Sequence, residues 1–122
     1  MLVTVPDAGL HEILASQALL LQLWPGAAEE VITLLRVLQL TMPSLADALA
    51  FGIVVLIGAG QQSAIVLRWE RTTVTAIGRD AHGEQVPDPG EGPQQICHLE
   101  VRDVAVDGQS VLTLRSAATV NQ

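Results

Sequence analysis

The chain has 122 residues, of which 49% are hydrophobic and 16% are charged, and its formal net charge is −7. This composition excludes an intrinsically disordered chain, because disorder needs low hydrophobicity, and the length predicts a single domain over residues 1–122. The acidic charge argues against binding to nucleic acid or to an anionic membrane surface, since both depend on clustered basic residues.

The N-terminal part of the chain, residues 7–51, has the periodicity of helices. Apolar residues recur every three or four positions after Asp7, a predicted helix cap, and Pro25 ends this first helix. A second helix is expected over 27–40 and a short third helix over 44–51. We therefore predict two or three N-terminal helices.

The C-terminal part, residues 53–119, has the β-branched composition and alternation of strands. A change of phase at Arg102–Asp103 predicts a β-bulge, and Asp107–Gly108 predicts a two-residue hairpin turn. The strands are expected over 53–57, 64–69, 72–77, 96–106 and 111–119. The predicted fold class is α+β, with the helices packed on one face of a mainly antiparallel sheet of about five strands.

A polar segment rich in proline and glycine, residues 79–95, separates two of the predicted strands. Long loops of this kind are either functional or mobile. Asp80, His82 and Glu84 lie in it and are our candidate ligand-binding or metal-binding residues, although their spacing matches no EF-hand or helical His-pair pattern. The alternative interpretation is an ordinary solvated loop.

Two further motifs carry weaker chemical signals. The apolar run 53–57 followed by Gly58 and Gly60 resembles the opening of a dinucleotide-binding βαβ unit, but a β-branched stretch follows where that unit needs a helix. We expect these glycines in a turn between two strands. Cys97 and His98 are adjacent on a predicted strand, so their side chains point to opposite faces and cannot form a nucleophile–base pair.

The strand phase has a second consequence for Cys97, the only cysteine of the chain. Cys97 shares its phase with Leu99 and Val101, so we expect it to be buried and chemically quiet. We predict no catalytic residue and no cofactor. A lone cysteine forms no intramolecular disulfide, and residues 1–6 lack the basic residue of a secretory signal, so a cytoplasmic location is expected.

A stretch without charge, residues 48–67, is long enough to cross a membrane. Its most apolar part is short and β-branched, turn-forming residues at 58–63 interrupt it, and no basic cluster flanks it. Two strands are therefore the preferred interpretation, and a membrane-inserted small subunit remains a minor alternative.

The helices are apolar over more than half of their circumference, whereas a helix on a sheet needs an apolar stripe only about 100° wide. The remaining apolar surface predicts a homo-oligomer or a protein partner. We expect the interface to use four residues of the N-terminal helices: Leu20, Leu23, Trp24 and Leu38. The leading hypothesis is a non-catalytic interaction or assembly module, acting as a homo-oligomer or as a small subunit, adaptor or chaperone-like partner. The alternative from another class is a small enzyme or ligand-binding protein with a site near the 79–95 loop.

Overall fold

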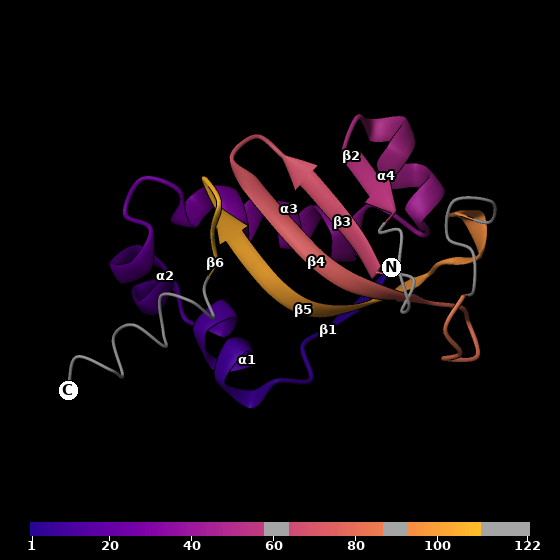
Figure 1. The fold of residues 1–122 in the computed structure, drawn as a ribbon, viewed down its shortest axis with the longest axis horizontal. Helices are drawn as coiled ribbons and strands as arrows, with labels where there is room; N and C mark the ends of the chain where they lie inside the picture. Colours follow the sequence, from indigo (N-terminus) through magenta and orange to yellow (C-terminus); the bar gives the residue numbers. More distant parts are fainter. Residues whose placement is uncertain (58–63, 87–92, 111–122) are drawn as a thin grey trace.

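The computed structural model describes residues 1–57, 64–86 and 93–110. Figure 1 shows the strands of one sheet side by side, with α3 behind them and α4 at the opposite end from α2. The elements are, in chain order, β1 (Leu2–Thr4), α1 (Ala8–Ala15), α2 (Gln17–Leu23), α3 (Ala28–Leu40), α4 (Leu45–Phe51), β2 (Val54–Ile57), β3 (Ala64–Trp69), β4 (Thr72–Arg79), the 3-10 helix η1 (Pro93–Gln95), β5 (His98–Val106) and β6 (Gln109–Ser110).

The first predicted helix is divided in two at Ser16, so the expectation of one continuous helix is wrong. Ser16 has extended backbone angles, φ −112° and ψ 111°. Its hydroxyl oxygen accepts a hydrogen bond from the N–H of Leu19 at 3.2 Å, which makes it the N-cap of α2. A serine inside an apolar periodic stretch can therefore begin a new helix without changing the periodicity.

The second and third predicted helices are confirmed as α3 and α4. The carboxylate of Asp47 accepts hydrogen bonds from the backbone N–H of Ser44 at 3.0 Å and from its hydroxyl at 2.9 Å, so a capping box begins α4. Gly52 ends it in the left-handed conformation, with φ +102°, where a residue with a Cβ would be strained.

The strands form one mixed sheet in the order β1-β5-β4-β3-β2, and β6 also pairs with β5. All pairings are antiparallel except that of β1, which lies parallel to β5. The α+β class is confirmed, and β1 is a strand that the sequence did not predict. The amino group of Met1 donates to the carbonyl oxygen of Leu38 at 3.1 Å, which holds the start of β1 at the C-terminal end of α3.

The predicted bulge and hairpin turn are both present. Thr75 pairs with Asp103 and Ala76 with Val101, which leaves Arg102 as the extra residue of β5. Asp107 and Gly108 have φ values of 52° and 82°, the pattern of a type I′ hairpin turn. The predicted strand 111–119 lies outside the described residues. The last described strand, β6, ends immediately before it, at Ser110.

The core lies between the helices and one face of the sheet. Along β4 and β5, side chains that enter the core alternate with side chains on the other face of the sheet, because successive residues of a strand point to opposite faces. The fully buried members include Leu10 of α1, Leu20 of α2, Leu34 and Leu38 of α3, Leu45 of α4, Val74 of β4, and Leu99, Val101 and Val104 of β5. Among the residues that the structure describes, no helix is long and apolar enough to cross a membrane.

Candidate functional site

The face of the sheet turned away from the helices is the first candidate surface, and we call it the open face. Neither Figure 1 nor the burial pattern places a helix of the described ranges against it. Its residues are Ala64, Val66 and Arg68 of β3; Thr73, Thr75, Ile77 and Arg79 of β4; and His98, Glu100, Asp103 and Ala105 of β5. All but Ile77 are half-buried or exposed.

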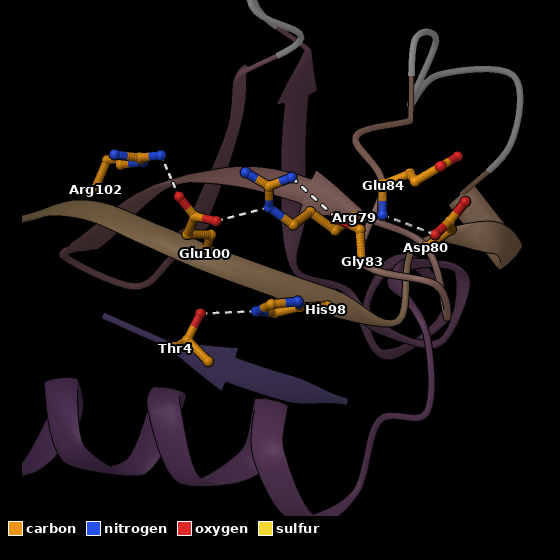
Figure 2. A network of polar contacts seen from close by, with 8 residues as sticks. All are labelled: Thr4, Arg79, Asp80, Gly83, Glu84, His98, Glu100 and Arg102. Carbon is orange, nitrogen blue, oxygen red and sulfur yellow. Dashed lines mark hydrogen bonds and ion pairs between the residues drawn. The ribbon is translucent and has the colours of Figure 1, made fainter. Parts of the chain in front are cut away.

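A network of charges centred on Glu100 occupies one part of the open face (Figure 2). Arg79 donates from Nε to the Glu100 carboxylate at 2.6 Å, and Arg102 forms an ion pair with the other carboxylate oxygen. The hydrogen bond from Arg79 holds the pKa of Glu100 below its usual value, with the positive charge of Arg102 adding to the effect. The bulge places Arg102 beside Glu100, so this irregularity of β5 helps to build the network.

The side chain of His98 extends the network toward β1. Its Nε2 lies 2.7 Å from the hydroxyl oxygen of Thr4, as Figure 2 shows. This contact joins the parallel pair β1 and β5 on the open face. Cys97, which precedes His98, is half-buried, so the expectation of a fully buried thiol is wrong. The reason is its place just outside β5, whereas Leu99 and Val101 are fully covered.

The candidate residues of the 79–95 loop form a turn. The Asp80 carboxylate accepts from the backbone N–H of His82 at 2.8 Å and of Glu84 at 3.0 Å. The Glu84 hydrogen bond is the main reason that the pKa of Asp80 lies below its usual value. The side chains of His82 and Glu84 are exposed. In the described part of the chain, no three histidine, cysteine or carboxylate side chains gather where a metal ion could bind.

Three of the four residues expected at an interface lie in the core of a single copy. Leu20 and Leu38 are fully buried, Trp24 is 5% exposed, and Leu23 is half-buried. The helices use these side chains to cover the sheet and one another, so they offer little surface to a second copy. Oligomerisation itself remains a prediction.

Gly58 and Gly60, the glycines of the dinucleotide-type motif, lie outside the described residues. The chain returns after them as β3, which is antiparallel to β2. A dinucleotide-binding unit would have a helix there and a parallel strand after it. A strand therefore follows the motif where such a unit needs a helix, while the predicted turn itself lies outside the described residues.

A groove between α1 and α3 is the second candidate surface. It consists of an inner hollow of about 510 Å³ beside β1 and an outer hollow of about 590 Å³ toward the start of α3, both lined by Leu14, Ala15, Ile32 and Arg36. Apolar side chains of the inner hollow are Val3, Val5, Leu14, Ile32 and Leu35. Its polar lining consists of Thr4, His11, Arg36 and Gln39.

The groove was not predicted from the sequence, although two signals for it exist. Glu29, Thr33 and Arg36 recur at helical spacing and form a polar stripe on α3, and His11 lies on the polar stripe of α1. The missing information was tertiary, because nothing local shows that these stripes flank one hollow. No family model, curated protein or solved structure is significantly similar to this chain.

Proposed function

We propose that the protein is a non-catalytic interaction module that assembles with a second copy of itself through the open face. The observation that carries this proposal is a neutral strip of small and β-branched residues across the middle of that face. The strip consists of Ala64 and Val66 of β3, Thr73 and Thr75 of β4, and Ala105 of β5. Asp103 of β5, the ladder partner of Thr75, borders the strip, and its carboxylate accepts a hydrogen bond from the Ser110 hydroxyl at 2.6 Å. Water-facing positions of an antiparallel sheet are usually polar, whereas Ala64, Val66 and Ala105 are apolar.

The geometry suits packing of one sheet on another. Two sheets pack face to face about 10 Å apart when their side chains interdigitate, and this requires short side chains without unpaired charge. Val66 pairs with Thr75 in the ladder, and Arg68 pairs with Thr73, so the only arginine of β3 stands at one end of the strip. At the other end, Glu100 is already neutralised by two arginines.

The charges also argue against nucleic acid as the partner. Arg71 donates to the Asp107 carboxylate from Nε, at 3.2 and 3.0 Å, and from Nη2, at 2.6 Å, and Arg79 and Arg102 share Glu100. Arginines engaged in this way are not free to contact phosphates. We place the protein in the cytoplasm, where a half-buried, unpaired Cys97 stays reduced.

The assembly is tested by light scattering coupled to size exclusion over a range of protein concentrations. We expect a mass that approaches twice the chain mass of 12.9 kDa. Because each copy carries a charge of −7, added salt should strengthen the association by screening repulsion. A constant mass of one chain at high concentration and in high salt would refute the proposal.

Matched variants locate the surface. Thr75→Glu places a charge in the middle of the neutral strip and should shift the protein to the monomer, while Gln22→Glu adds the same charge on the exposed surface of α2 and should not. Circular dichroism checks that both variants fold. If both variants associate equally well, the open face is not the interface.

A further inference from the structure

The α1–α3 groove has the chemistry of a small-molecule site that is separate from the open face. The inner hollow has a volume of about 510 Å³, within the 300–1,000 Å³ typical of ligand pockets. Its apolar lining comes from three elements: β1, α1 and α3. An apolar chain laid there would be removed from water on several sides, which is the main source of affinity for such ligands.

The charged group of the groove is Arg36. In the described residues Arg36 makes no hydrogen bond or ion pair, whereas Arg71, Arg79 and Arg102 each have an acidic partner. A guanidinium group without a partner can bind a carboxylate through two parallel hydrogen bonds. The chain has a net charge of −7 and repels anions over most of its surface. The free guanidinium group of Arg36 beside an apolar hollow attracts an anionic group to this one place.

The other polar residues of the groove determine where the anionic group of a ligand is favoured. The inner hollow has no acidic lining residue, and His11 of α1 and Gln39 of α3 supply further donors near its rim. The acidic residue of the outer hollow is Glu29, two helical turns or about 10 Å along the axis from Arg36. One anionic group is therefore favoured near Arg36, and a second one farther out is opposed by Glu29.

We propose that the α1–α3 groove binds a medium-chain aliphatic monocarboxylate, with the carboxylate on Arg36 and the chain over Leu14, Ile32 and Leu35. A dicarboxylate is disfavoured by Glu29, and an uncharged chain of the same length lacks the contact with Arg36. The proposal is independent of assembly through the open face, because Arg36, Leu14, Ile32 and Leu35 all lie outside that face.

Titration of the full chain with octanoate, followed by amide NMR shifts, tests the site. We expect saturable shifts in α1, β1 and α3, and smaller ones on the open face. Arg36→Gln, which changes an exposed side chain, should weaken octanoate binding by about tenfold or more. The matched control is Arg68→Gln, which removes the same charge from another exposed arginine, outside the groove, and should leave the affinity unchanged.

Octanol is the uncharged probe of the same chain length. Octanol should bind to the unaltered protein more weakly than octanoate does. The affinity for octanol should be the same in the Arg36→Gln variant as in the unaltered protein. Three results would overturn the proposal: equal affinity for octanol and octanoate, an equal loss in the Arg36→Gln and Arg68→Gln variants, or no saturable shift in the groove at millimolar octanoate.

Discussion

The two faces of the sheet are built from the same strands and differ in what covers them. On β4 and β5 the helix-facing residues, such as Val74 and Leu99, are fully buried and apolar. Their neighbours on the open face, such as Thr75 and Glu100, are neutral or paired polar residues. One face therefore contributes most of the stability of the fold, whereas side chains on the other face are less constrained by packing within one copy.

Truncation of a core side chain should give the largest difference between the faces. Leu99→Ala removes a fully buried side chain of β5 and should lower the free energy of unfolding by about 2–5 kcal/mol, because a cavity remains. Thr75→Ala, on the open face of β4, should change it by less than about 1 kcal/mol. Denaturant unfolding at low protein concentration measures both, and comparable losses would contradict the division between the faces.

A smaller effect is expected at Gly78 of β4, where an added side chain would meet core residues. A Cβ at this position would lie 2.6 Å from Cδ1 of Ile65 and 2.9 Å from Cδ1 of Ile96. Gly78→Ala should therefore destabilise the fold by about 1–3 kcal/mol through overpacking. Ile65→Val removes the nearest of these atoms, so the double variant should lose less stability than the two single variants added together. Strict additivity would show that the close approach is not the cause.

Thr72 is a buried polar residue among the apolar residues on the helix-facing side of the sheet, and replacing it should raise the free energy of unfolding. Its side chain is fully buried, and its hydroxyl has no hydrogen-bond partner in the described structure. Thr72→Val keeps the shape and removes the unsatisfied group, so the free energy of unfolding should increase by about 1 kcal/mol. A decrease, measured by thermal and urea unfolding, would mean that the hydroxyl is satisfied in solution, for example by a buried water molecule.

The smallest effect is expected on the open face, at Glu100, because ion pairs that water can reach contribute little. The pKa of Glu100 is lowered in the folded protein, so its contribution to stability is present above the unfolded pKa of about 4.3 and is lost as the pH falls through the folded value. The deficit of Glu100→Gln relative to the unaltered protein should therefore be present at pH 7 and shrink below about pH 4. A deficit that is constant with pH would show that the charge of Glu100 is not responsible.

Local signals in the sequence were sufficient for much of the fold. The capping residues of α4 and the Asp107–Gly108 turn act within a few residues, and the change of phase in β5 identified the bulge. Ser16 was missed because a serine N-cap inside an apolar run leaves the helical period unchanged. β1 was missed because it has three residues, and its pairing partner in β5 is more than ninety positions away.

The surfaces were harder to predict than the elements, for a physical reason. Apolar periodicity shows which face of a helix is buried, but it does not show whether its own sheet or a second copy covers that face. Apolar periodicity predicts an interface at Leu20, Trp24 and Leu38, but these side chains lie in the core of a single copy. Arg36 of α3 and His11 of α1 line the same hollow, which no local pattern in the sequence shows.

The most direct test is whether a second copy of the chain covers the open face. A soluble paramagnetic chelate broadens the NMR signals of methyl groups that it can reach. We expect the methyl groups of Thr73 and Thr75 to be broadened in dilute protein and protected at high concentration, while the methyl group of the exposed Thr33 of α3 is broadened in both. Equal broadening of all three at both concentrations would contradict this expectation.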